Sequence, residues 1–424
     1  MEGFAEYNTK LEQVFYLWKK DSSSFSNHSN ITASKVRELI DITTLRESGV
    51  FFTSDALAEK AINSFNVPID DTALVVDPTC GSGSLLVAAS RKLSVMPLAS
   101  ETLRQWGKQL CGIDLFPEFV YCTKLRIVLE SLVRGAKADK SLSELLDLLI
   151  NIHTGDCLDN LSVIAKATHL ALNPPYSNSK TTARYSWANG KINNAAIYYY
   201  ELSLVLKDGC SISAILPDVL RSGSRFAAWR SAVEPALTNS NVSVEGRFDK
   251  QTDIDIFILN GLVNKKGFDK VEWQTAETLG KAGSPKLRDF FEVAVGAVVP
   301  YRDPHEGKLY AYIHPNTLPR WGEISKIPES RNFLGRVFQP PFVAIRRTSG
   351  PRDKHRAVPT LVLGKRLVAV ENHLIVLTPK NGSLDKCREL LKLLEEKYVN
   401  EFLNSRIRCR HLTVSAISEI PWRF

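Results

Sequence analysis

The chain has 424 residues, of which 44% are hydrophobic and 24% charged, values that exclude a disordered or fibrous protein and allow two or three globular domains. No apolar run approaches the roughly 18 residues that a membrane helix needs, and residues 1–10 lack the features of a secretory signal, so we expect a cytoplasmic protein without a membrane partner. The formal net charge of +8 is modest, so only its distribution along the chain can indicate a partner.

Residues 1–45 show helical periodicity with a polar interruption over 21–30, which predicts a small N-terminal helical cap. From residue 72 to about 260, short apolar runs alternate with amphipathic stretches, the pattern of a parallel sheet with right-handed crossovers. The expected fold class is therefore α/β, with a doubly wound sheet. The predicted strands are 74–77, 110–114, 152–155, 169–173, 212–217, 242–248 and 254–259. The predicted helices are 84–92, 118–134, 194–206 and 224–233.

This alternation stops near residue 265, which predicts a domain boundary between 265 and 285. Residues 281–424 contain 25 Lys and Arg against 14 Asp and Glu, a net charge of +11, whereas residues 1–280 carry a net charge of −3. Such asymmetry indicates a polyanionic partner, although a well-solvated basic surface would give the same charges. We expect a final helix over 384–403, followed by a strand-like tail.

The seven cysteines are scattered, with no Cys-x-x-Cys pair and no histidine at a spacing used by zinc sites. We therefore expect free thiols that pack as small apolar residues, and no metal site. The cysteines are at positions 80, 111, 122, 157, 210, 387 and 409.

A strand, a glycine-rich turn and a helix start follow one another over residues 75–85. Gly81 and Gly83 allow a tight turn and a close approach to a ligand, and the helix N-terminus offers free N–H donors. Asp77 precedes the turn in Asp-Pro-Thr-Cys-Gly-Ser-Gly. A carboxylate here repels a pyrophosphate but suits the cationic amino group of S-adenosylmethionine, so the loop favours that cofactor.

Asp114 ends the next predicted strand and is followed by Leu115. An acid at this place can accept hydrogen bonds from both ribose hydroxyls of a nucleotide, and a helix N-cap is the alternative. Asp114 lies 31 residues beyond Gly83, which predicts a loop and an extra helical turn over residues 93–109.

Asn173-Pro174-Pro175-Tyr176 stands at the carboxyl end of another predicted strand, where ligands bind in open α/β sheets. The side-chain carbonyl of Asn173 and the main-chain carbonyl of Pro174 can accept the two N–H bonds of an exocyclic aromatic amine. They would direct the nitrogen lone pair at a sulfonium methyl group, so catalysis would rest on positioning. Tyr176 would stack on a target base that has left the duplex, and an ordinary rigid turn is the alternative.

The order of these motifs resembles the gamma group of DNA adenine-N6 methyltransferases, which includes TaqI-like enzymes and type I modification subunits. Gly49-Val50-Phe51-Phe52-Thr53 stands where that group has a cofactor-binding motif. The resemblance implies a Rossmann-like methyltransferase domain over 46–270, after the cap at 1–45. It also implies a C-terminal α+β target-recognition domain over 271–424.

The resemblance also implies roles for single residues. S-adenosyl-L-methionine would be bound by Phe52, Thr53, Asp77, Pro78, Cys80, Gly81, Gly83, Asp114, Leu115, Asp156 and Asn173. The catalytic residues would be Asn173, Pro174, Pro175 and Tyr176. Tyr176 and Phe248 would stack on the target base. A plain turn residue is the alternative for Asp156 and a core side chain for Phe248, and we expect Tyr198 and Tyr200 to be core residues.

Duplex DNA is the implied partner, in the cytoplasm of a bacterial or archaeal cell and in a restriction-modification or phage-defence system. The C-terminal third should hold its phosphates through Arg346, Arg347, Arg352, Lys354 and Arg356. Which residues read bases does not follow from the sequence. The 45 N-terminal residues are too short for a nuclease domain, which leaves room for a separate restriction endonuclease or specificity subunit.

Four alternatives stay open at this stage. Glutamine-N5 protein methyltransferases share the Asn-Pro-Pro-Tyr turn, but their chains lack a following basic domain. RNA base methyltransferases use the same turn, but their RNA-binding module usually precedes the catalytic domain. DNA cytosine-N4 methyltransferases more often begin the turn with Ser. A scaffold that has lost activity would be expected to have broken motifs, and both motifs are intact here.

Overall fold

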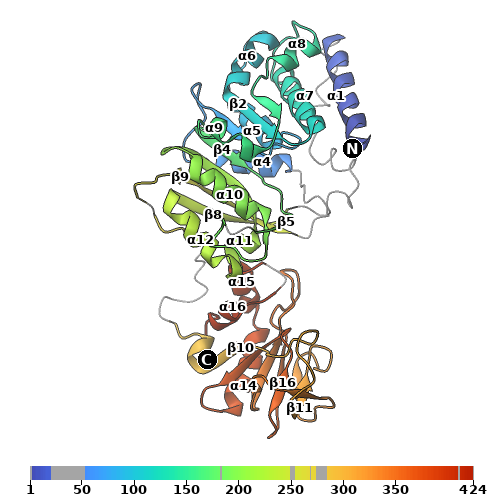
Figure 1. Cartoon of the computed structure of the whole chain (residues 1–424), viewed down its shortest axis with the longest axis vertical. Coiled ribbons are helices and arrows are strands. Elements are labelled where there is room, and N and C mark those ends of the chain that lie inside the picture. Colours follow the sequence, from blue (N-terminus) through green and yellow to red (C-terminus); the bar gives the residue numbers. More distant parts are fainter. Residues whose placement is uncertain are drawn as a thin grey trace. The chain divides into compact units, whose positions relative to one another are not determined.

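A computed structural model of the chain describes residues 2–20, 53–181, 184–248, 254–267, 269–273, 284–408 and 411–423 (Figure 1). The chain divides into two compact units, which are described separately. The N-terminal unit comprises Met1–Arg221 and Arg225–Trp273, and the C-terminal unit comprises Ser222–Ser224 and Gln274–Phe424.

The described part of the N-terminal unit is built on a seven-stranded sheet of order β3-β2-β1-β4-β7-β9-β8. Strands β1, β2, β3, β4 and β7 run parallel to one another, whereas β9 runs antiparallel to both β7 and β8. The strands are β1 (Val75–Asp77), β2 (Leu110–Asp114), β3 (Ile152–Thr154), β4 (His169–Leu172), β7 (Ser211–Pro217), β8 (Leu237–Arg247) and β9 (Asp255–Val263). This confirms the predicted doubly wound sheet.

Strand β1 is the centre of this arrangement. From β1 the chain builds β2 and then β3 on one side, and it crosses to the other side for β4. The side chains of β1, β4 and β7 are buried throughout, as expected for parallel strands covered by helices on both faces. The order of connection therefore reverses between β1 and β4, and an open α/β sheet binds ligands outside the carboxyl ends of the strands at such a point.

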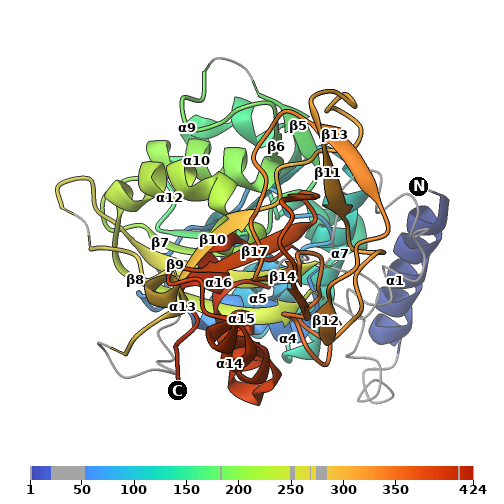
Figure 2. The same cartoon turned by 90° about the horizontal axis from the view of Figure 1, so that it is seen from below.

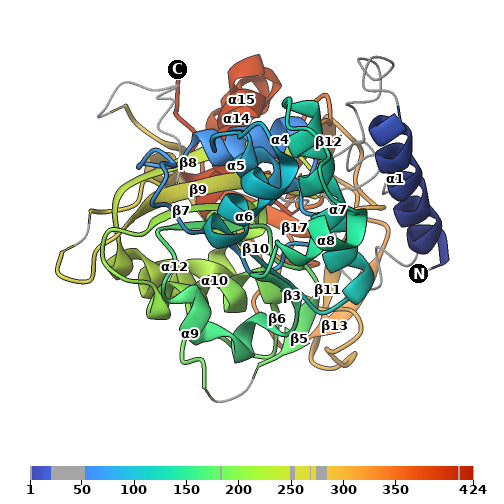
Figure 3. The same ribbon diagram turned by 90° about the horizontal axis from the view of Figure 1, so that it is seen from above.

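Helices cover this sheet (Figure 3). The α-helices that follow α1 in the described part of this unit are α4 (Asp55–Asn63), α5 (Ser84–Ser90), α6 (Ala99–Gln109), α7 (Pro117–Val133), α8 (Leu142–Asp147), α9 (Leu161–Ile164), α10 (Asn194–Val205), α11 (Asp218–Ser222) and α12 (Ala227–Val233). Only a loop and one helical turn were expected over residues 93–109, but α6 is an eleven-residue helix. The helix buries Leu103 and Trp106 between polar residues, which hid its periodicity.

The first helix, α1 (Glu2–Lys20), lies along α7 (Figures 1 and 3). Tyr7, Leu11 and Phe15 are buried in the same hydrophobic core as the sheet, so α1 is an integral part of the N-terminal unit. The polar interruption that the sequence predicts over residues 21–30 lies outside the described residues.

In the described part of the C-terminal unit, a five-stranded sheet of order β10-β17-β14-β15-β12 has both faces buried (Figure 2). Alternate residues of β14 point to opposite faces: Val343 and Ile345 pack with the C-terminal helices, and Phe342 and Ala344 pack with the second sheet, β13-β11-β16. The strands are β10 (Phe291–Val295), β11 (Lys308–Ile313), β12 (Gly322–Ile324), β13 (Ser330–Phe333), β14 (Phe342–Arg346), β15 (Pro359–Val362), β16 (Val368–Val370) and β17 (Leu374–Pro379). The helices are α13 (Leu287–Phe290), α14 (Leu384–Glu395), α15 (Lys397–Arg406) and α16 (Val414–Ser418).

Two details at the C-terminal end differ from the sequence prediction. The helix expected over 384–403 is divided at Glu396, which has an extended backbone and lies in a charged stretch with no apolar side chain to hold it against the sheet. The expected strand-like tail is wrong. It contains α16, which begins because the Thr413 hydroxyl accepts a hydrogen bond from the backbone N–H of Ala416.

Among the described residues, no helix combines the length and apolar character that crossing a bilayer requires. The six described cysteines are free and buried, as predicted, and Cys409 lies outside the described residues.

The packing of α1 predicts unequal effects for two of its leucines. Leu11 is 1% exposed and Leu17 is 58% exposed. Leu11→Ala should destabilise the N-terminal unit by about 2–5 kcal/mol because it leaves a cavity, whereas Leu17→Ala should change stability by no more than about 0.5 kcal/mol. Urea unfolding followed by circular dichroism measures both changes. Equal losses, or none for Leu11→Ala, would show that α1 does not belong to this core.

Candidate active site

The loops that follow β1 to β4 surround one cavity of about 280 Å³ in the N-terminal unit. The loops lie together because the carboxyl ends of these parallel strands meet at one edge of the sheet. The predicted site residues that line the cavity are Thr53, Asp77, Pro78, Cys80, Gly81, Asp114, Leu115, Asp156, Asn173, Pro174 and Pro175. Gly83, Tyr176 and Phe248 do not line it, and Phe52 lies outside the described residues.

The glycine loop needs glycine at two places. Gly81 and Gly83 have φ angles of +51° and +82°, a region that other residues rarely adopt. A Cβ atom on Gly83 would also lie 2.7 Å from the side chain of Thr123 on α7. Gly83 therefore lies against α7 and allows α5 to start close to that helix. Gly81 lines the cavity.

Arg126 supports the glycine loop from α7, and the sequence analysis missed it. This arginine is buried, and its guanidinium donates to the main-chain oxygen of Ser82 (2.6 Å) and to the hydroxyls of Ser82 and Ser84 (3.3 and 3.2 Å). It also pairs with Asp55 at the start of α4 (3.5 Å). An arginine within the apolar run from Leu125 to Leu129 was the available signal.

Two carboxylates, the buried Asp77 and the half-buried Asp114, lie at the ends of β1 and β2. Asp77 accepts a hydrogen bond from the backbone N–H of Thr79 (3.3 Å). Asp114 accepts from the N–H groups of Gly81 (2.9 Å) and Phe116 (3.0 Å), so it holds the glycine loop as well. Burial raises the pKa of Asp77 to about 8, and it also raises the pKa of Asp114. A buried acid whose charge is disfavoured in this way gains from a cationic ligand.

The amide of Asn173 is held in one orientation. Its Nδ2 donates to the Thr53 hydroxyl (2.8 Å), and its Oδ1 accepts from the Tyr176 hydroxyl (2.8 Å). The main-chain oxygen of Asn173 accepts from the hydroxyl of Thr79, at 3.3 Å. Thr53, the glycine loop and the Asn-Pro-Pro-Tyr turn are thereby joined through one residue.

Tyr176 and Phe248, the residues predicted to stack on a target base, contact each other. Their ring centroids are 6.1 Å apart in an edge-to-face arrangement, and each side chain is 5% exposed. The Tyr176 hydroxyl also donates to the main-chain oxygen of Ile215 at 3.2 Å. Both rings are therefore packed in this structure, and their stacking role stays a prediction.

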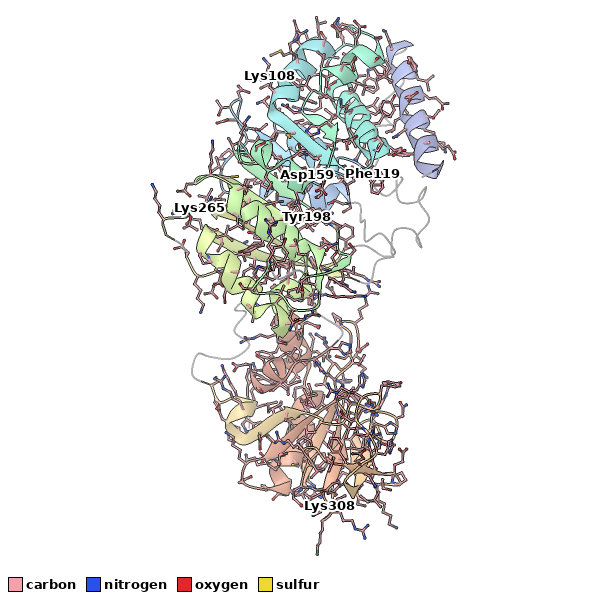
Figure 4. All side chains as sticks on the ribbon, in the orientation of Figure 1. Lys108, Phe119, Asp159, Tyr198, Lys265 and Lys308 are labelled. Carbon is pink, nitrogen blue, oxygen red and sulfur yellow. The ribbon has the colours of Figure 1, made fainter. Side chains whose placement is uncertain are left out.

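The remaining wall of the cavity comes from β3 and α10. Asp156 lines it and also caps a short helical turn, because its Oδ1 accepts from the N–H of Leu158 at 2.9 Å. Tyr198 was expected in the core, but it also lines the cavity, and burial raises its pKa to about 12. Phe119, which Figure 4 labels together with Tyr198, is a second lining residue that the sequence analysis missed. The helical position of Tyr198 gave no sign of which neighbour it faces.

Asn193 and Asn194 hold the turn in place from the start of α10. Asn193 donates through Nδ2 to the main-chain oxygen of Tyr176 (2.8 Å), and the Nδ2 of Asn194 donates to the Ser177 hydroxyl (2.9 Å). Both residues stand at the beginning of α10, where asparagine usually acts as a cap. That local role, which Asn193 also fills, concealed their contacts with a segment 17 residues away.

The cations predicted to contact DNA differ in exposure. Arg352 and Lys354 are exposed, whereas Arg346 and Arg347 are half-buried and donate to main-chain carbonyls of their own unit. Arg356 corrects the prediction, because it is 0% exposed and its guanidinium bonds to Ile407, Asn404 and Ser349. It stabilises the C-terminal unit.

The described residues include no group of three His, Cys, Asp or Glu that could hold a metal ion.

The raised pKa of Asp77 predicts a pH-dependent stability. The value is raised from 3.8 to about 8, so the ligand-free fold favours the neutral carboxyl. This contribution is complete below about pH 4 and is lost as the pH rises through about 8. Asp77→Asn should therefore gain thermal stability relative to the wild type between about pH 5 and about pH 9, as calorimetry without ligand would measure. Asp71→Asn, at an exposed position, is the matched control. Parallel curves for wild type and Asp77→Asn would contradict the argument.

No protein-family model matches the sequence, and no curated protein matches it. Among solved structures, the chain is similar to the type IIL restriction-modification enzyme MmeI in complex with DNA, with a TM-score of 0.55 and 12% identity over 91% of this chain and 70% of that chain. It is also similar to the type IIG restriction endonuclease BpuSI (TM-score 0.44, 14% identity, 92% of this chain) and to a type I methyltransferase subunit from Streptococcus thermophilus (0.36, 17%, 57%). The chain spans 61% and 51% of the length of these two proteins. The likeness to MmeI shows that this chain shares the mixed α/β fold of that structure.

Proposed function

We propose that this chain is a restriction-modification DNA methyltransferase that moves a methyl group from S-adenosylmethionine to the 6-amino group of a flipped adenine in duplex DNA. The observation that supports this most strongly is one shared cavity. The acids Asp77 and Asp114 line the same space as the Asn173 to Pro175 turn. One edge of one sheet thus presents groups suited to the cofactor and groups suited to an aromatic amine.

The cavity residues fit the cofactor. Asp77 is a buried carboxylate with a raised pKa, so the cationic amino group of S-adenosylmethionine would favour its ionised form. Asp114 would accept hydrogen bonds from the ribose hydroxyls of the cofactor. Asp156, Leu115 and Tyr198 would surround the adenine ring of the cofactor. When bound, the cofactor supplies an electrophilic methyl group on a positively charged sulfur. Pro78, Cys80 and Gly81 would form the floor beneath it.

Asn173 would bind and aim the target amine. Thr53 holds its Nδ2, which leaves Oδ1 as the acceptor. The Tyr176 hydroxyl now occupies that acceptor, so an incoming amine would take the place of this hydroxyl. The Pro174 carbonyl would accept the second N–H bond. Two fixed acceptors localise the nitrogen lone pair, and the rate would come from this positioning rather than from a general base.

Base binding requires Tyr176 and Phe248 to separate, because their rings touch in edge-to-face contact. The C-terminal unit would recognise the duplex, with the exposed Arg352 and Lys354 at phosphates. A separate endonuclease or specificity subunit would complete the system. The solved DNA complex of MmeI, which has a similar fold, supports this proposal.

Labelled methyl transfer tests the proposal directly. S-adenosylmethionine carrying a labelled methyl group is incubated with unmethylated duplex DNA, structured RNA or protein, and the products are separated after hydrolysis. Label in 6-methyladenine is expected. Label confined to RNA or to glutamine would identify one of the alternative methyltransferases and contradict the proposal.

Asn173→Ala should lower kcat by about 100-fold to 1,000-fold, the usual loss when one fixed polar partner of a transition state is removed. Calorimetric titration should still detect cofactor binding by this variant, because Asp77 and Asp114 are unchanged. Asp77→Asn should show the reverse pattern, with weaker cofactor binding as the primary defect. Wild-type turnover in Asn173→Ala would exclude the proposed role of this amide.

A further inference from the structure

Two lysines face each other directly after the Asn-Pro-Pro-Tyr turn. Strands β5 (Asn178–Lys180) and β6 (Lys191–Asn193) form an antiparallel pair whose register places Lys180 opposite Lys191. Both lysines are exposed. Side chains directly opposite in such a pair have Cβ atoms about 5 Å apart, and like charges there repel each other. An anion between the two ammonium groups would offset this repulsion.

The hairpin is fastened to the turn that holds the proposed target base. The Asn193 side chain, in β6, donates a hydrogen bond to the main-chain oxygen of Tyr176. The backbone N–H of Asn194 donates one to the main-chain oxygen of Ser177 (both 2.8 Å). Arg225 donates to the main-chain oxygens of Asn189 and Lys191. These hydrogen bonds hold the backbone of the two lysines close to the turn. Four residues of extended chain, at most about 13 Å, separate Tyr176 from Lys180.

An aromatic cluster stabilises the loop of this hairpin. Tyr185 and Trp187 lie in the loop with ring centroids 5.3 Å apart, and Trp187 contacts Tyr200 of α10 at 5.4 Å. Arg184 is neutralised by Glu201, at 2.7 Å. The described ion pairs include neither Lys180 nor Lys191, so these two charges are available to a ligand.

The charge of this segment is opposite in sign to the net charge of the first 280 residues. Residues 177–194 contain three cations and no acidic residue, whereas residues 1–280 as a whole carry a net charge of −3. A general need for solubility would not concentrate unpaired cations at the one hairpin that touches the turn. A polyanion at this edge of the N-terminal unit accounts for both the position and the sign.

We propose that Lys180 and Lys191 form a phosphate clamp that binds the backbone of duplex DNA beside the target adenine. This proposal rests on the proposed function and adds a DNA contact within the N-terminal unit itself. Duplex DNA presents one negative charge about every 1.7 Å along its axis, so a phosphate near the target nucleotide can lie between the two ammonium groups. The clamp would then hold the strand while the base leaves the stack.

The test compares DNA affinity at several salt concentrations. Lys180→Gln/Lys191→Gln removes both charges, and Lys180→Arg/Lys191→Arg keeps them. The matched control is Lys92→Gln/Lys108→Gln, which removes two exposed lysines at the opposite edge of the sheet. Lys92 follows the end of α5, and Lys108 lies near the end of α6, just before β2 (Figure 4 labels Lys108). Fluorescence anisotropy with a labelled duplex, from about 50 to about 200 mM salt, measures each affinity.

For the glutamine pair we expect weaker binding and a slope of log K against log salt that is smaller in magnitude by about one, because the two lysines hold one phosphate together. The arginine pair and the control should keep the wild-type slope. Undiminished cofactor binding by the glutamine pair shows that it has folded. A slope equal to that of the control would overturn the clamp while leaving the proposed function intact. Failure of the wild type to bind duplex DNA would overturn both.

Discussion

Parallel pairing of β1 with β2 on one side and β4 on the other is the constraint on which the site depends. It brings the carboxyl ends of three strands to one edge, although Asp77, Asp114 and Asn173 are far apart in the sequence. The connection order reverses between β1 and β4, so no crossover helix covers the gap between them. The cavity lies in that gap. Asp77, Asp114 and Asn173 each reach it from the end of one of these strands, whereas Thr53 and Tyr198 reach it from outside the sheet.

A hydrogen-bonded network holds the loops that follow these strands in place. Arg126 joins Ser82 and Ser84 of the glycine loop to Asp55. Two residues before Asp55, Thr53 holds the amide of Asn173. A buried guanidinium is stabilising only when its partners are in place, since losing one side of such a pair costs about 3–5 kcal/mol. The shape of the proposed cofactor loop and the orientation of the proposed catalytic amide therefore depend on connected contacts.

Much of this architecture could be predicted because its signals are local. Apolar runs marked the strands, and the turns at Gly81 and Pro174 marked where they end. Residues whose surroundings are set by distant segments could not be predicted. Arg126, Tyr198 and Asn193 acquire their contacts only when α7, α10 and the turn are packed together.

In the C-terminal unit, the sequence also failed to predict which charged side chains are exposed. Charge alone suggested Arg356 as a DNA contact, but its guanidinium is enclosed by α15 and neighbouring loops. A sequence pattern reports the kind of side chain and not its exposure. Exposure instead leaves Arg352 and Lys354 as the predicted cations that remain available to a phosphate.

We propose that one cavity holds the methyl donor against the Asn173 turn. A crystal structure of the chain with S-adenosylhomocysteine, the demethylated cofactor, would test this arrangement. We expect the ligand in the cavity, with its amino group at Asp77, its ribose hydroxyls at Asp114 and its sulfur facing Asn173. A ligand bound elsewhere, or with its amino group away from Asp77, would contradict it.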